Sequence, residues 1–120
     1  MNAPDLKQRT KRFALDTIKF FEAPPKDETS RILGRQLLRS GTSVGANYRA
    51  ANRAKSDADF INKMTIVEEE ADECCYWLEL LTEAGKVTPM KTASLLREAN
   101  ELVAITVASI NTARRNGRKS

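Results

Sequence analysis

Arginines recur at helical spacing within residues 30–60, and they are the side chains of this chain best suited to bind a ligand. On an α-helix, residues about 18 positions apart point the same way, so Arg31 lies under Arg49 and Arg35 lies under Arg53. The four guanidinium groups would follow one helix face for about 33 Å, at about 1.5 Å per residue. Positive charge spread in this way suits the phosphate backbone of RNA or DNA. The alternative is that these arginines pair with acidic residues of the following helix.

The two ends of the chain carry further candidates for contact with nucleic acid. Lys11 and Arg12 lie near the start of the chain, and Arg114 and Arg115 lie near its end. If consecutive helices run in opposite directions, the start of the first and the end of the fourth lie at the same end of the molecule. We therefore expect a positive surface there that suits RNA or single-stranded DNA. The alternative is that these charges only keep the protein soluble.

A group of polar residues in the same segment could be taken for a small active site. The group comprises Gln36, Arg39, Ser43 and Asn47, with Glu70 or Glu73 as the expected acid opposite. It contains no general base and nothing that would activate a nucleophile. We therefore interpret it as a buried hydrogen-bond network that holds two helices in register. These six residues are called the polar seam.

The composition argues against an enzyme, a metal site and a bound cofactor. The chain has no histidine, which removes the commonest general base and the commonest metal ligand. The carboxylates of residues 68–73 lack the Glu-x-x-His pairs of di-iron bundles, so a solvated or ion-paired face is expected. Cys74 and Cys75 point about 100° apart on a helix, which disfavours a disulfide between them, and Cys74 is expected in the core.

Length and charge indicate one domain with separated charges. The chain has 120 residues and a net charge of +4. Residues 1–55 carry 12 basic and 5 acidic side chains, residues 56–86 carry 2 and 9, and residues 87–120 carry 6 and 2. This separation suggests charge pairing within or between subunits, plus a basic outer face. With no secretory leader and no long apolar run, we expect a soluble cytoplasmic protein with reduced thiols and no membrane partner.

Hydrophobic spacing predicts four amphipathic helices, and no stretch alternates as a strand does. Thr29 or Ser30 is the expected cap of the second helix, and Ser56 with Asp59 fits a capping box at the start of the third. Gly85 is expected to end the third helix. The predicted helices cover residues 5–23, 29–54, 56–85 and 90–115.

Short joints between these helices favour an all-α fold, an antiparallel up-down-up-down four-helix bundle. The bundle is expected over residues 1–115, followed by a disordered basic tail at 116–120. Gly34, Gly41 and Gly45 fall inside the second helix, and each costs about 1 kcal/mol relative to alanine. Close approach of another helix would offset this cost, and the alternative is a break at Gly41.

The fourth predicted helix has two apolar stripes, which is more than a monomeric bundle normally buries. One stripe consists of Leu95, Ala99, Leu102, Thr106, Ser109 and Ala113, and the other of Leu96, Val103, Val107 and Ile110. The second stripe favours a subunit interface in a homo-oligomer. Tyr76 and Trp77 could stack on bases, but they follow a run of core residues, so we expect them at helix or subunit contacts.

Two stretches carry a family resemblance. The sequence QLLRSGTSVGANYRAANRAKSDADFI, followed by EEEADECCYWLELL, resembles the bacterial four-helix bundle proteins encoded in intervening sequences of large-subunit ribosomal RNA genes. That family is related to the accessory variability determinant proteins of diversity-generating retroelements. The matching positions are Gln36, Arg39, Ser40, Ser43, Val44 and Asn47, and then Glu70, Ala71, Asp72, Glu73, Tyr76, Trp77 and Leu78.

The resemblance implies a small cytoplasmic protein that assembles as a barrel-like homopentamer. It also implies an accessory role and no enzymatic activity, since the retroelement relatives bind a reverse transcriptase and nucleic acid through basic surfaces. The expected partners are further copies of the chain, RNA or DNA, and a protein such as a reverse transcriptase or a ribosome-associated factor. Relatives often carry glutamate where this chain has Ala50, so any ion pair made by that glutamate is missing here.

Overall fold

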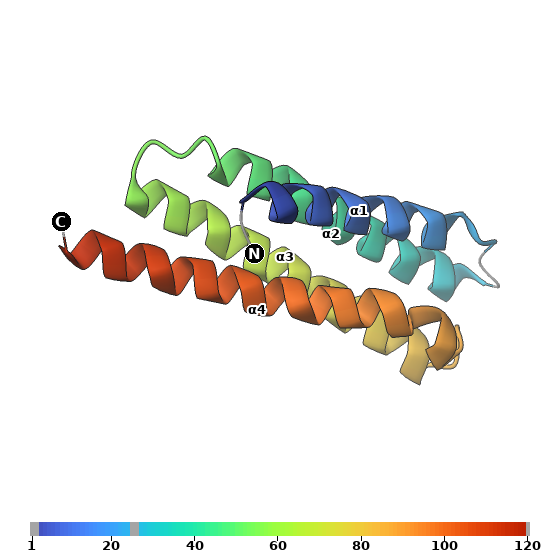
Figure 1. Cartoon of the computed structure of the whole chain (residues 1–120). Coiled ribbons are helices and arrows are strands. Elements are labelled where there is room, and N and C mark those ends of the chain that lie inside the picture. Colours follow the sequence, from blue (N-terminus) through green and yellow to red (C-terminus); the bar gives the residue numbers. More distant parts are fainter. Residues whose placement is uncertain (1–2, 25–26, 120) are drawn as a thin grey trace.

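The protein consists of four long helices, and the computed structural model describes residues 3–24 and 27–119. The helices are α1 (Ala3–Glu22), α2 (Glu28–Ala51), α3 (Asp57–Glu83) and α4 (Pro89–Lys119). Each helix runs opposite to the one before it, in a body 54 Å long and 21 Å across (Figure 1). Neighbours in sequence pack most closely, α1 and α4 contact each other much less, and the two diagonal pairs do not pack on each other. The predicted all-α four-helix bundle is confirmed.

Side-chain caps explain where α2 and α3 begin. Asp27 caps α2, because its side chain accepts a hydrogen bond from the Ser30 amide at 2.8 Å. The expectation that Thr29 or Ser30 caps this helix is therefore wrong, since the aspartate precedes both and already satisfies a free amide of the first turn. Ser56 caps α3 as predicted, and it accepts from the Asp59 amide at 3.1 Å.

Gly85 ends α3 as predicted, in the left-handed conformation with a φ of 71°. The amides of Gly85 and Lys86 donate to the carbonyls of Thr82 and Leu81, at 3.0 and 2.9 Å. These two bonds satisfy two of the free carbonyls in the last turn of the helix and reverse the chain. α4 then begins at Pro89, where a helix needs no amide donor.

α2 is continuous through Gly41, so the alternative of a break at this glycine is wrong. A Cβ at Gly41 would lie 2.7 Å from two atoms of the Thr17 side chain, which shows how closely α1 approaches here. At Gly45 a Cβ would lie 3.4 Å from the Thr10 carbonyl oxygen, which is an ordinary contact. The close packing of α1 thus offsets the low helix propensity of glycine. α2 ends at Ala51, three residues before its predicted end.

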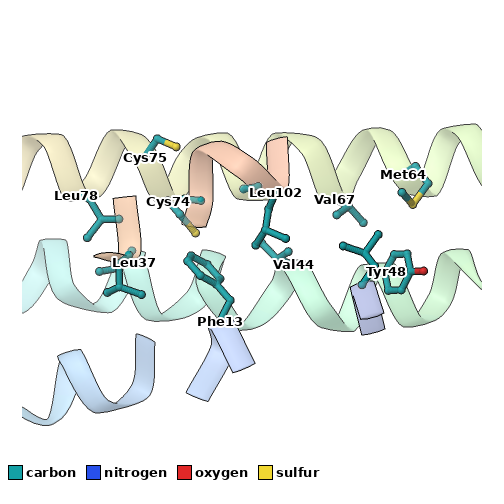
Figure 2. Close-up of a cluster of buried hydrophobic side chains, with 14 of the residues drawn as sticks. Phe13, Leu37, Val44, Tyr48, Met64, Val67, Cys74, Cys75, Leu78 and Leu102 are labelled. Carbon is teal, nitrogen blue, oxygen red and sulfur yellow. The ribbon is translucent and has the colours of Figure 1, made fainter. Parts of the chain in front are cut away.

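All four helices contribute to the core. Figure 2 shows its centre, where Phe13 of α1 lies beside Val44 of α2, Cys74 of α3 and Leu102 of α4. Each of these four side chains is at most 1% exposed. The expectation that Cys74 lies in the core is confirmed, and Cys75 is buried as well.

The two buried thiols predict a loss of stability at alkaline pH. Burial raises the pKa of Cys74 to about 12 and the pKa of Cys75 to about 11, from an ordinary value of 9.0. As the pH rises, the unfolded chain therefore loses these protons first, and the free energy of unfolding should fall from about pH 9 upward. Urea unfolding at about pH 8, 9 and 10 measures this fall. The free energy of unfolding of a Cys74→Ala, Cys75→Ala double variant should fall less over this pH range. An equal fall in the variant and the original protein contradicts the prediction.

α4 extends well beyond the start of α1. Arg9 of α1 donates two hydrogen bonds to the carboxylate of Glu98, at 2.5 and 2.8 Å, and forms a second ion pair with Glu101. These bonds raise the pKa of Arg9, with Glu98 making the larger contribution. They also place the start of α1 beside the middle of α4. Arg114 lies 13 residues after Glu101, which is about 20 Å farther along the helix axis.

The structure differs from the predicted end of the fourth helix and from the predicted disordered tail. α4 continues past Arg115 through residues 116–119, and Ser120 lies outside the described residues. A Cβ at Gly117 would lie 3.8 Å from a carboxylate oxygen of Asp57, so this last turn lies against the start of α3. Basic residues near a helix C-terminus also complement its negative dipole end. Both effects extend the helix beyond the predicted end.

The bundle covers most of both apolar stripes of α4. In the second stripe, Ile110 is buried, Leu96 and Val103 are half-buried against the core, and Val107 is 36% exposed. The argument for a subunit interface from this stripe is therefore wrong. The physical reason is that α4 packs against α3 and the core with a broad face, and this face covers three of the four residues of the second stripe.

Candidate nucleic-acid interface

The outer face of α2 presents the four predicted arginines to solvent. Arg31, Arg35, Arg49 and Arg53 are all exposed. Arg31 forms an ion pair with Glu28, one turn earlier on the same helix, at 3.0 Å. Within the described part of the chain, Arg35, Arg49 and Arg53 make no ion pair. The guanidinium groups of these three residues are therefore available to phosphate.

Lys11 lies beside this arginine face, whereas Arg12 has a partner on its own helix. Thr10 of α1 packs on Gly45 of α2, so the exposed Lys11 lies at that level, about one turn before Arg49. Lys11 therefore adds positive charge near the middle of the arginine face. The Arg12 side chain is 78% exposed and lies 3.5 Å from Asp16.

Arg114 and Arg115 are exposed at the end of the bundle where α2 connects to α3 (Figure 1). They lie near the level of Arg53 and not beside the start of α1. The single basic end predicted from the two termini is therefore wrong, because α1 is shorter than α4 and starts beside its middle. Lys11 belongs to the α2 face, while Arg114 and Arg115 form a separate basic group at one end.

The polar seam lies on the outer surface between α2 and α3. Arg39 donates to Glu70 at 3.1 Å and to Glu73 at 2.6 Å, so both candidate acids lie opposite it. The Arg39 side chain is 49% exposed, and that of Glu73 is 40% exposed. Asn47 donates to the carbonyl of Ser43 on its own helix at 2.8 Å. The expectation of a buried network is wrong, because these positions lie at the rim of the helix contact, outside the core.

The buried polar residue of α2 is Ser40, which the seam pattern did not include. The Ser40 hydroxyl donates to the carbonyl of Gln36 at 3.0 Å and accepts from the thiol of Cys74 at 3.3 Å. Gln36 itself is exposed. Ser40 follows Leu37 by three residues and precedes Val44 by four, so its place on the apolar stripe was the available signal. A hydroxyl that bonds to the preceding turn can enter a core without another polar partner.

Tyr76 and Trp77 contact each other edge to face, with ring centroids 5.2 Å apart. Trp77 is half-buried and packs against the core, which confirms the expectation of a helix contact for this residue. Its indole N–H is enclosed and has no hydrogen-bond partner among the described residues. Tyr76 is 54% exposed. The pair therefore anchors one ring and leaves the other on the surface.

α3 carries the opposite charge on its outer face. Glu69, Asp72, Glu79 and Glu83 are exposed, and none of them makes an ion pair within residues 3–24 and 27–119. Residues 3–24 and 27–119 contain no group of three acidic, cysteine or histidine side chains that could hold a metal ion. No helix in the described part of the chain is long and apolar enough to cross a bilayer. The arginine face of α2 and the acidic face of α3 thus remain distinct.

Fold and sequence both match a known group of proteins. A crystal structure of a protein with unknown function from the S23 ribosomal protein family of Bacteroides thetaiotaomicron is similar, with a TM-score of 0.85 and 34% identity. The match covers 92% of this chain and 99% of that chain. No curated protein matches the chain. The sequence profile of the family described as 23S rRNA-intervening sequence protein matches residues 4–108, which include parts of all four helices. The chain therefore belongs to the 23S rRNA-intervening sequence protein family.

Proposed function

We propose that the protein is a non-enzymatic, homo-oligomeric helical bundle that binds RNA or DNA weakly and without sequence preference. The observation that carries this proposal is the outer face of α2, where Arg35, Arg49 and Arg53 are exposed without an ion pair among the described residues. Arginines spread along a helix neutralise phosphates without reading bases. The proposed contact residues are Lys11, Arg12, Arg31, Arg35, Arg49, Arg53, Arg114 and Arg115.

Fluorescence anisotropy with labelled RNA and DNA strands, at about 50 and 200 mM salt, tests this proposal. We expect affinity to fall steeply as the salt concentration rises. Arg49→Gln should make the slope of log affinity against log salt less steep by about one. Arg97→Gln is the matched control, since Arg97 is exposed on α4 and lies outside the proposed contact residues. No binding to either nucleic acid at low salt overturns the proposal.

Exposed apolar residues on two opposite helices support the homo-oligomer. Leu15 and Ile18 of α1 are 51% and 39% exposed, and Ile66 and Tyr76 of α3 are 42% and 54% exposed. α1 and α3 do not pack on each other within the bundle. Contact between α1 of one copy and α3 of the next is head to tail, and such contacts form a ring if the rotation closes. Five copies are expected from the family resemblance, and light scattering that gives only the 13.4 kDa chain mass contradicts this.

The alternative function is a scaffold for a protein partner, for example a reverse transcriptase or a ribosome-associated factor. The observation in its favour is that Ile32 of α2 and Met90 of α4 are 52% and 89% exposed at the end where both helices begin. A tagged protein that retains a defined partner after nuclease treatment, and loses it in Ile32→Lys, favours this function. Release of every partner by nuclease contradicts it.

A further inference from the structure

A cavity of about 750 Å³ lies at the end of the bundle where α2 and α4 begin. It opens among the end of α1, the first turns of α2 and α4, and the turn that follows α3, at the right-hand end of Figure 1. The space is consistent with the limited contact between α1 and α4, whose ion pairs at Arg9 lie farther along the bundle. Its volume is within the range of about 300–1,000 Å³ that is typical of sites for small organic ligands.

The floor of this cavity is apolar and partly aromatic. Phe20, Phe21, Leu81 and Val87 line it. A Cβ at Gly34 would lie 3.3 Å from the ring of Phe21, so the missing side chain lets this ring lie close to the backbone of α2. Aromatic side chains offer a flat surface on which another ring system can stack.

The mouth of the cavity is strongly basic. The basic residues that line it are Lys19, Arg31, Arg35, Lys86 and Lys91. Arg31 and Lys86 are engaged by nearby carboxylates, at 3.0 and 2.8 Å. Lys19, Arg35 and Lys91 come from three different helices, and none of them makes an ion pair within the described residues. No described lining residue is acidic, so the mouth favours an anion with more than one negative charge.

The helix ends near the cavity also suit a ligand with phosphate groups. α2 and α4 both begin at this end of the bundle, where Asp27 caps the start of α2 and the dipole of α4 adds positive potential. Ser30, in the first turn of α2, also lines the cavity.

We propose that this cavity binds a nucleoside phosphate. The base lies against the apolar floor, and the phosphates lie among Lys19, Arg35 and Lys91. A fatty acid fits less well, because it carries one charge and needs a long apolar channel. The ligand is a free nucleotide or the phosphorylated 5′ end of a strand. The proposal goes beyond the proposed function, since it concerns a cavity that shares only Arg31 and Arg35 with the open face of α2.

Titration with the fluorescent nucleotide N-methylanthraniloyl-ATP tests the proposal in three variants. Lys19→Gln with Lys91→Gln removes two cations of the mouth, and Ala23→Trp fills the cavity without a change of charge. Both should weaken binding by about tenfold, as expected for the loss of two charge-assisted contacts. Arg49→Gln with Arg53→Gln removes the same charge from the open face, and it should leave nucleotide affinity within about twofold. Both lysines are exposed, so the first variant decides the test if Ala23→Trp does not fold.

Competition defines the ligand. Unlabelled ATP should displace the probe, whereas inorganic triphosphate and laurate should displace it much less. Displacement by a thymidine strand with a 5′-phosphate, but not by one with a 5′-hydroxyl, identifies the strand end, and displacement by neither identifies a free nucleotide. Three results overturn the proposal: no saturable binding, equal weakening in both charge variants, or equal competition by inorganic triphosphate. If the cavity does not bind nucleotides, salt-dependent binding of strands to the α2 face can still be observed. If the α2 face does not bind strands, nucleotide binding in the cavity can still be observed.

Discussion

Phe13→Ala is expected to lower the free energy of unfolding by about 3–5 kcal/mol, the usual range when a buried phenylalanine is truncated to alanine. Phe13 is 1% exposed, and its ring lies beside Val44 and Cys74 at the centre of the core (Figure 2). It is the largest fully buried side chain that α1 contributes. Because α1 contacts α4 little, its docking depends mainly on this ring and on the α2 contact. Urea unfolding monitored by circular dichroism measures the loss.

The matched control for Phe13→Ala is Leu15→Ala on the same helix. Leu15 is 51% exposed, so its truncation should change the free energy of unfolding by less than about 0.5 kcal/mol. Hydrogen exchange adds a local measurement, since the amides of α1 should lose protection before those of α3 in the Phe13 variant. Equal losses in the two variants would show that Phe13 does not hold α1 in place.

Gly41→Ala is expected to destabilise the protein by about 1–2 kcal/mol, although alanine is the better helix former by about 1 kcal/mol. The new Cβ would lie 2.7 Å from the Cγ2 and Oγ1 atoms of Thr17, and Thr17 is completely buried. The Thr17 hydroxyl also donates to the carbonyl of Phe13 at 2.8 Å, so the side chain cannot turn away without losing that bond. α1 must therefore move outward.

Gly45→Ala is the matched control, because it makes the same change one turn along α2. Its Cβ would lie 3.4 Å from the nearest atom, so the gain in helix propensity should leave the protein unchanged or more stable by up to about 1 kcal/mol. Thr17→Ala should recover part of the loss in the Gly41→Ala background, since it removes the two atoms that clash. A stabilising effect of Gly41→Ala would contradict the close approach of α1 and α2.

The helices could be predicted because their signals are local. Apolar residues such as Leu37 and Val44 recur at helical spacing, and Ser56 and Gly85 are strong start and stop signals. The start of α2 could not be predicted to the residue, because Asp27 is followed by two other good caps and only the backbone geometry selects among them. The end of α4 was missed because its last turn lies against α3, a contact that no local pattern reports.

The candidate interface, too, could be predicted only in part from the sequence. Helical periodicity placed Arg35, Arg49 and Arg53 on one outward face, and these residues are exposed in the structure. Periodicity could not select ion-pair partners, because pairing depends on which helices pack together. Arg9 reaches Glu98, 89 positions away in sequence, and this contact places the start of α1 beside the middle of α4.

The sequence by itself determined the all-α bundle, the order of its helices and the alignment of arginines along α2. These properties follow from periods and caps within single helices, which the tertiary fold does not change. Only the tertiary structure decided which charges are paired, where α1 lies against α4, and that a basic cavity with an aromatic floor lies where α2 and α4 begin. Those properties depend on helix offsets and separations, and an offset of a few turns moves a side chain by 10 Å or more along the bundle, at about 5.4 Å per turn.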